Sequence, residues 1–395
     1  MAESISGEGG GAVMAGHTNA SMNAALKAKN DEFYTLLTDI EKEMRYYRKH
    51  FKGKTVLCNC DDPFESNFFK YFVLNFNRLG LKKLIATCYH TSPIVGQQLQ
   101  YWYDKDGQMS FLFGDELDEK YSEKHPYKAV VTKVYDTSGD GGIDMLDVAE
   151  LFKSGENELT ELEGDGDFRS QECLHLLDES DIVVTNPPFS LFREYVAVMM
   201  EHKKHFIIIG NSNAITYKEV FPLIMQNRLW LGVTRSGTGS MWFRIMDDFP
   251  EKSGQKIENG IRYQTIGNSA WFTNLDVKKR HEELILVKRY SPENYPSYTN
   301  YDAIEVSKVA DIPCDYSGMM GVPITFLGKY NPDQFEILGL SSTMAKPIDE
   351  CVEPDAEYIK GGPRFYVKEG HKKYKRCYDR IVIRNKHPEP PKEVK

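Results

Sequence analysis

Short apolar runs alternate with amphipathic, charged segments along the first half of the chain. A strand, a helix and a second strand follow one another within about 35 residues, an order typical of a βαβ unit with parallel strands. The alternation resumes after residue 180, so it predicts an α/β fold with a mostly parallel, doubly wound sheet. The predicted strands are residues 54–60, 83–89, 181–185 and 205–209, and the predicted helices are residues 39–47, 67–76 and 192–201.

The amino-acid composition and the pattern of apolar runs divide the chain into three parts. Residues 1–27 are rich in glycine, alanine and serine and poor in bulky apolar residues, which predicts a disordered tail. Residues 28–235 carry the α/β pattern, with an acidic insertion at about 104–165. In residues 236–395, short aromatic runs separated by glycine and proline predict a second region of mixed or β-rich structure.

The composition is that of an ordinary globular protein, with 41% hydrophobic and 27% charged residues. The apolar runs are too short to span a bilayer and no cationic start precedes an apolar stretch, so we expect neither a membrane segment nor a signal peptide. The seven cysteines are odd in number and lack metal-type spacing. We therefore expect reduced thiols, a cytoplasmic location and no bound metal.

Charge is unevenly distributed along the chain, whose net charge is −9. Residues 104–165 hold 17 acidic against 6 basic side chains, whereas residues 360–386, the basic stripe, hold 10 basic against 2 acidic ones. Cations neutralise phosphates, and the aromatic residues interleaved with them stack on bases, so the stripe is a candidate nucleic-acid surface. A solvated charged tail is the alternative. The candidate DNA-binding residues are Lys360, Arg364, Lys372, Lys373 and Arg376.

The most informative motif is Asn186-Pro187-Pro188-Phe189, which follows the predicted buried strand at 181–185. Because proline has no N–H, the two prolines end the strand and leave carbonyl oxygens free to accept hydrogen bonds. The Asn186 side-chain oxygen and the Pro187 carbonyl can then converge on one amino group, while Phe189 offers a flat face to a planar ring. The motif is a candidate receptor for an exocyclic amine on an aromatic base, although Asn-Pro-Pro is also an ordinary turn.

Three further segments supply candidate polar groups. Residues 58–63 follow the first strand without the glycine-rich turn that binds a pyrophosphate. Asp61 and Asp62 suit an ammonium group or a ribose instead, or simply the start of a helix. Residues 166–168, Gly-Asp-Phe, can hold the amino edge and the face of an adenine, or form an ordinary turn. Residues 31–35, Asp-Glu-Phe-Tyr-Thr, are a third candidate, or a helix start.

Residues 136–147 match a calcium-binding loop at positions 1, 5, 6 and 9 but depart from it at Ser138 and Asp147. The preceding residues, 129–135, alternate like a strand rather than an entering helix. We expect a Gly/Asp-rich turn before a helix at 145–152, with calcium binding as the alternative. The chain shows no nucleophile–base pair, no HExxH and no Walker loop, so its chemistry must depend on positioning and a cofactor.

Taken in order, these segments resemble the EcoRI-type adenine-specific (N6) DNA methyltransferases. The resemblance extends over roughly residues 29–340 and implies a Rossmann-like methyltransferase fold that binds S-adenosylmethionine. It also implies that residues 236–395 are a target-recognition region. The segments that carry it are residues 30–35, 58–63, 67–72, 166–170 and 184–195.

The resemblance implies roles for the residues around the cofactor. Tyr34 and Thr35 would border it, Asp167 would accept a hydrogen bond from its adenine amine, and Phe168 would lie against the ring. The chain departs from the wider superfamily because it lacks both the glycine-rich loop and the acid that usually follows the second strand. The residues that would hold the methionine and sugar end are Cys58, Asn59, Cys60, Asp61 and Asp62.

The resemblance further implies that the target adenine is flipped out of double-stranded DNA. Asn186 and the Pro187 carbonyl would accept both N6 hydrogens, and Phe189 would stack on the base. The implied catalytic residues are Asn186, Pro187, Pro188 and Phe189. We expect the enzyme to act as a monomer, with a possible cognate restriction endonuclease that forms no direct complex with it.

Two other functions stay open at this point. A methyltransferase acting on guanine N2 of RNA or on a protein glutamine would use the same amine receptor. A non-catalytic DNA-binding module is the alternative from another class.

Overall fold

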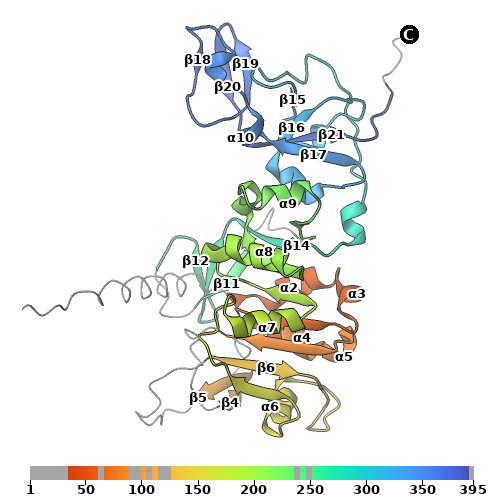
Figure 1. Ribbon diagram of the computed structural model, residues 1–395, viewed down its shortest axis with the longest axis vertical. Coiled ribbons are helices and arrows are strands. Elements are labelled where there is room, and N and C mark those ends of the chain that lie inside the picture. The colour runs from red at the N-terminus through yellow and green to blue at the C-terminus, as the bar shows by residue number, and fades with distance from the viewer. Residues whose placement is uncertain are drawn as a thin grey trace, which may run out of the picture.

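The computed structural model (Figure 1) describes residues 34–60, 66–88, 99–103, 109–113, 126–234, 241–245 and 251–390. The expected tail, residues 1–27, and the candidate residues Asp61 and Asp62 lie outside the described part of the chain. Within the described part, no helix combines the length and the apolar character needed to cross a membrane.

An eight-stranded sheet forms the centre of the molecule. In spatial order its strands are β10 (Trp230–Leu231), β14 (Ser269–Thr273), β9 (His205–Asn211), β8 (Ile182–Thr185), β2 (Thr55–Cys58), β3 (Lys83–Thr87), β6 (Tyr127–Val131) and β7 (Glu158–Glu161). The four inner strands, β9, β8, β2 and β3, are parallel, whereas the flanking strands pair antiparallel. The predicted parallel α/β sheet is therefore confirmed in its central part.

Both faces of this sheet are buried. Successive strand residues point to opposite sides, and each side belongs to an apolar core. Leu57 and Val183 join one apolar core, and their chain neighbours Val56 and Val184 join the other. The first core includes residues of α7 (Gln171–Glu179) and α8 (Phe192–Glu201). The second includes residues of α2 (Leu37–Met44), α3 (Arg48–Phe51), α4 (Asn67–Leu74), α5 (Phe76–Leu79) and α6 (Met145–Lys153). The sheet is doubly wound, as the sequence predicts.

Local sequence signals set the ends of these helices. The Ser66 side chain accepts a hydrogen bond from the backbone N–H of Phe68 and caps α4, and Ser170 caps α7 in the same way. At the other end, Gly80 follows α5 with a φ of 64°, a conformation that glycine adopts without steric cost. The predicted helix at 67–76 is thus two helices, which meet at Asn75.

The expected acidic insertion supplies one edge of the central sheet, since β6 pairs with β3 and β7 pairs with β6. Between β6 and α6, the Asp136 carboxylate accepts hydrogen bonds from the N–H groups of Gly139 (2.6 Å) and Gly141 (2.7 Å). Asp147 accepts one from Thr137 (2.8 Å). These bonds form a Gly/Asp-rich turn before a helix, and the described residues contain no His, Cys, Asp and Glu cluster able to hold a metal ion.

A second, four-stranded sheet joins the N-terminal segment to residues 241–266. Its strands are β1 (Tyr34–Thr35), β11 (Met241–Arg244), β13 (Ile261–Ile266) and β12 (Gln255–Glu258), all antiparallel. A separate contact joins α2 to the residues after β10, since the buried Glu43 accepts hydrogen bonds from the N–H groups of Val233 (2.8 Å) and Thr234 (2.6 Å). Burial raises the pKa of Glu43 above its usual range.

Residues 304–385 form two further sheets at one end of the molecule (Figure 1). Apolar residues of the first, such as Ile337 and Ile381, belong to the same core as α8, so this region packs onto the central sheet. β14 lies in the central sheet, although it comes after residue 235, where the sequence predicts the α/β region to end. The first sheet consists of β15 (Ile304–Glu305), β16 (Met320–Pro323), β21 (Arg380–Asn385) and β17 (Phe335–Leu340), and the second of β18 (Glu357–Tyr358), β20 (Lys373–Arg376) and β19 (Tyr366–Gly370). The remaining α-helices and strands are α9 (Phe221–Met225), α10 (Ser341–Met344) and the hairpin of β4 (Leu99–Tyr103) and β5 (Met109–Phe113).

His281 forms a polar link between the central sheet and the C-terminal region. One ring nitrogen lies 2.5 Å from a carboxylate oxygen of Asp333, and the other lies 2.8 Å from one of Asp276, which follows β14. The contact with Asp333, followed by that with Asp276, raises the pKa of His281 above its usual value. The two carboxylates therefore favour the protonated ring.

We expect His281→Gln to remove a pH-dependent part of the stability. Because the folded-state pKa is raised, the stabilisation is fully present below about pH 6.5 and is lost as the pH rises through the folded-state pKa. Thermal unfolding scans from about pH 5.5 to about pH 8.5 should show the largest difference between wild type and variant at the acid end. A difference that is constant over this range would contradict a charged link.

Candidate active site

The carboxyl ends of β2 and β8 lie side by side, because the two strands are parallel neighbours with Leu57 opposite Val183. This pairing brings Asn59, just after β2, next to the end of β8. The Thr185 hydroxyl donates a hydrogen bond to the backbone carbonyl of Asn59, and both residues are buried. Asn59 of the first candidate loop and Thr185, the residue before the Asn186 motif, are 126 residues apart in the chain and are thus joined directly.

Tyr195 of α8 joins a third candidate segment to this pair. Its buried hydroxyl donates to the Asn59 side-chain oxygen, and its ring centroid lies 4.9 Å from that of Phe168. Asn59 therefore contacts the end of β8 through its carbonyl and Tyr195 through its side chain, and Tyr195 contacts Phe168. The sequence analysis did not select Tyr195, although its place three residues after the apolar Phe192 on the same helix marks an inward position whose hydroxyl needs a partner.

The backbone turns sharply after Asn59. Cys60 has a φ of 66°, in the left-handed region that residues other than glycine rarely adopt. Such a conformation costs of order 1 kcal/mol and persists only where the surroundings impose it. The residue before this turn, Asn59, is fixed by its buried hydrogen bonds, and the turn itself uses Cys60 rather than a glycine. Cys58, the last residue of β2, is buried in the core that α4 covers.

Thr35 of β1 lies against the start of α4, the helix that follows the first candidate loop in the chain. Its carbonyl accepts a hydrogen bond from the Asn67 side chain (2.8 Å), which holds β1 against the first turn of α4. The Thr35 hydroxyl is buried and has no hydrogen-bond partner among the described residues. A buried hydroxyl of this kind suits a polar ligand. The backbone of Tyr34 lies opposite that of Arg244 in β11.

Asp167 is held in the ionised state by Arg169. The guanidinium contacts both carboxylate oxygens, at 2.9 and 2.6 Å, and these hydrogen bonds lower the pKa of Asp167 below its usual range. The Asp167 side chain is 20% exposed, so it is reachable from solvent. An ionised carboxylate offers about four acceptor positions, which leaves capacity for a ligand amine.

The Asn186 motif ends β8 as its prolines predict. Asn186 is 9% exposed, and the Pro188 carbonyl accepts a hydrogen bond from Leu191 (3.0 Å) in a short 3-10 turn that leads into α8. Phe189 is only partly buried, against the core that contains α4. The motif thus places a nearly buried amide and a partly accessible ring at the carboxyl end of a central strand. Ligands of doubly wound sheets bind at such ends.

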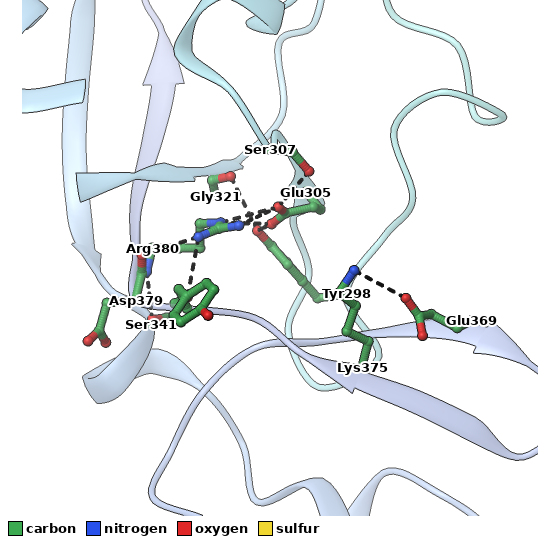
Figure 2. Close-up of polar contacts among 10 residues, drawn as sticks. Tyr298, Glu305, Ser307, Gly321, Ser341, Glu369, Lys375, Asp379 and Arg380 are labelled. Carbon is green, nitrogen blue, oxygen red and sulfur yellow. Dashed lines mark hydrogen bonds and ion pairs between the residues drawn. The ribbon is translucent and has the colours of Figure 1, made fainter. Parts of the chain in front are cut away.

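Part of the basic stripe is structural. Arg380 of β21 points at Glu305 of β15, with Nη2 2.7 Å from Oε1, and this pair is buried together with Tyr298, whose hydroxyl also donates to Glu305 (Figure 2). In the three-stranded sheet, Lys375 of β20 forms an ion pair of 3.2 Å with Glu369 of β19 (Figure 2). Arg380 therefore fixes the C-terminal sheet rather than facing solvent.

The five candidate DNA-binding residues of the stripe fall into two groups. Arg364 pairs with Asp379 at 3.0 Å, and Lys372 pairs with Asp355. Over the described ranges, the other three, Lys360, Lys373 and Arg376, have no acidic partner within 4 Å. Contact between these five residues and DNA stays a prediction.

A family model described as "Adenine-specific methyltransferase EcoRI" matches residues 21–386. The chain belongs to this family. It is therefore an adenine-specific methyltransferase, as the motifs at 58–63 and 184–195 indicate.

Similar proteins agree with this assignment. The chain is 44% identical over 345 residues to the type II methyltransferase M.EcoRI of Escherichia coli, an alignment that covers 84% of this chain and 91% of the relative. It is 36% identical over 375 residues to the type II methyltransferase M.MpnI of Mycoplasma pneumoniae, covering 92% and 98%. No solved structure matches the chain. Both relatives are named as type II methyltransferases.

Gly210 of β9 permits the packing that holds the motif helix of this methyltransferase. A Cβ at this position would lie 2.2 Å from a ring carbon of Phe192, the first residue of α8. We expect Gly210→Ala to displace α8 and to lower the free energy of unfolding by about 1–3 kcal/mol. Urea unfolding measures this loss. The matched control is Gly164→Ala, where a Cβ meets nothing within 4 Å, and an equal loss in both variants would contradict the packing argument.

Proposed function

We propose that this protein transfers the methyl group of S-adenosylmethionine to N6 of a flipped-out adenine in double-stranded DNA. Family membership supports adenine as the target and implies a methyl donor. The observation that carries the rest is the position of Asn186, nearly buried at the end of β8 and adjoining the Asn59–Tyr195–Phe168 group. An amine receptor at Asn186 and a cofactor site at Asn59 and Phe168 would thus share one edge of the sheet.

The receptor suits an exocyclic amine by its chemistry. Asn186 and the Pro187 carbonyl would accept the two N6 hydrogens and so orient the nitrogen lone pair. The partly accessible ring of Phe189 would stack on the flipped base. Holding the amine in one orientation converts a bimolecular encounter into an effectively unimolecular step, which suffices for most of the rate enhancement. No general base is required before transfer, because the proton can leave to water afterwards.

The cofactor candidates fit S-adenosylmethionine by their donor and acceptor types. Asp167, ionised and partly exposed, would accept from the adenine amine, with Phe168 beside the ring. The buried Thr35 hydroxyl would bond a polar group of the ligand, and the loop after Cys58 would hold its methionine and sugar end. When bound, this cofactor supplies a methyl group on a positively charged sulfur.

Double-stranded DNA is the substrate that membership of a restriction-modification system would favour over RNA guanine or a protein glutamine. Family membership likewise disfavours a non-catalytic module. We assign residues 236–395 to target recognition, with phosphate contacts from Lys360, Arg364, Lys372, Lys373 and Arg376. A DNA substrate is consistent with the expected cytoplasmic location, with action as a monomer and with a separate cognate endonuclease.

The amine receptor is tested by Asn186→Ala. We expect label from methyl-labelled S-adenosylmethionine to appear in unmethylated duplex DNA as N6-methyladenine, and kcat to fall at least about 100-fold in the variant because the amine loses its orientation. Cofactor affinity, measured by calorimetry, should be unchanged. Full activity in the variant, or label in RNA or protein instead of DNA, would overturn the proposal.

The cofactor assignment is tested by Asp167→Asn. Replacing an ionised acceptor of a charge-assisted hydrogen bond should raise the Kd for S-adenosylmethionine by about 10-fold or more. The matched control is Asp165→Asn, because its side-chain oxygen can still accept the backbone N–H of Asp167, a contact of 2.9 Å in the wild type. Equal affinities in both variants would remove Asp167 from the cofactor site.

A further inference from the structure

The four-stranded sheet β1–β11–β13–β12 has two chemically different faces. Residues opposite each other in an antiparallel pair share a face, and chain neighbours lie on opposite faces. Met241, Phe243 and Gln264 are at most 7% exposed, which identifies the inner face. The outer face therefore carries Trp242 and Arg244 of β11, Tyr263 of β13 and Lys256 of β12.

The residues of this outer face form one aromatic and cationic cluster. The Lys256 ammonium lies 4.8 Å from the ring centroid of Trp242 and 5.4 Å from that of Tyr263. Both rings are partly exposed, and Arg244 is exposed. Lys256 also contacts Glu258 at 2.6 Å, but an exposed ion pair contributes little and can be exchanged for another anion. We call Trp242, Arg244, Lys256 and Tyr263 the hairpin face.

The hairpin face continues directly to the candidate cofactor segment. Tyr34 of β1 pairs with Arg244, which pairs in turn with Tyr263. The next residue, Thr35, is held to the start of α4 by Asn67. The sheet therefore extends from a candidate cofactor segment, beside the start of α4, to the β12–β13 hairpin.

We propose that the hairpin face binds the DNA strand next to the flipped adenine. This inference rests on the proposed function and adds a second DNA contact to it, separate from the basic stripe. Partly exposed rings beside cations have the chemistry that single bases and phosphates require, since rings stack on bases and cations neutralise phosphates. A flipped base leaves its neighbours unstacked, and Trp242 or Tyr263 can cover such an exposed base.

Charge favours this assignment. In the basic stripe, Arg380 is buried against Glu305, and Arg364, Lys372 and Lys375 each pair with an acid. The stripe therefore presents less free positive charge than its sequence indicates. On the hairpin face Lys256 lies over two aromatic rings, and its one acidic partner, Glu258, is exposed and can be exchanged for a phosphate.

The test compares Trp242→Ala and Tyr263→Ala with matched controls. The probe is labelled duplex DNA made by amplification, which carries no methyl groups. We expect each alanine variant to raise the Kd for DNA about 10-fold or more through lost stacking, while the Kd for S-adenosylmethionine stays unchanged. Trp242→Phe, which keeps a ring, should restore most of the affinity.

Ile257→Ala is the control on the opposite face of the same hairpin, since Ile257 is 72% exposed and should leave the Kd for DNA unchanged. Arg244→Gln should reduce the slope of log K for DNA binding against log salt concentration by about 1, the change expected when one phosphate contact is lost. Tyr378→Ala tests the basic stripe, where this side chain is 88% exposed.

The outcomes separate the two hypotheses. Folded alanine variants that bind DNA as tightly as wild type, while Tyr378→Ala or changes in the stripe cations weaken binding, would overturn the hairpin face and leave the proposed function intact. A wild-type protein that transfers no label to DNA would overturn the proposed function itself.

Discussion

The arrangement of the candidate active site depends on the buried hydrogen bonds of Asn59. Its carbonyl accepts from Thr185 and its side-chain oxygen accepts from Tyr195, in a place where water cannot replace either donor. An unpaired polar group at such a depth costs roughly 1–3 kcal/mol, so each member of the network constrains the others. The ends of β2 and β8 and the helix α8 are thereby held in a single geometry, next to the left-handed turn at Cys60.

The same principle operates on a larger scale in the connection between the N-terminal segment and the rest of the chain. The Glu43 carboxylate is desolvated, and its bonds to Val233 and Thr234 offset part of that cost. Because β1 also pairs with β11, a ligand beside Thr35 and a strand of DNA on the hairpin face would contact one sheet.

Charge in the C-terminal region serves two different purposes. The buried Arg380–Glu305 pair satisfies hydrogen bonds in the interior and fixes the position of β21 against β15 (Figure 2). Surface pairs such as Arg364–Asp379 are partly exposed and can exchange partners at small cost. A run of cations in a sequence therefore combines structural and binding roles that composition alone does not separate.

The sequence by itself determined the α/β class, the inner strands and the Asn186 motif, because hydrophobic periodicity and proline act within a few residues. Tertiary structure alone decided the antiparallel flanks, the inclusion of β14 in the central sheet and the role of Tyr195. These features depend on contacts between segments that are far apart in the chain. Their energies come from burial and hydrogen-bond partners, which no local pattern records.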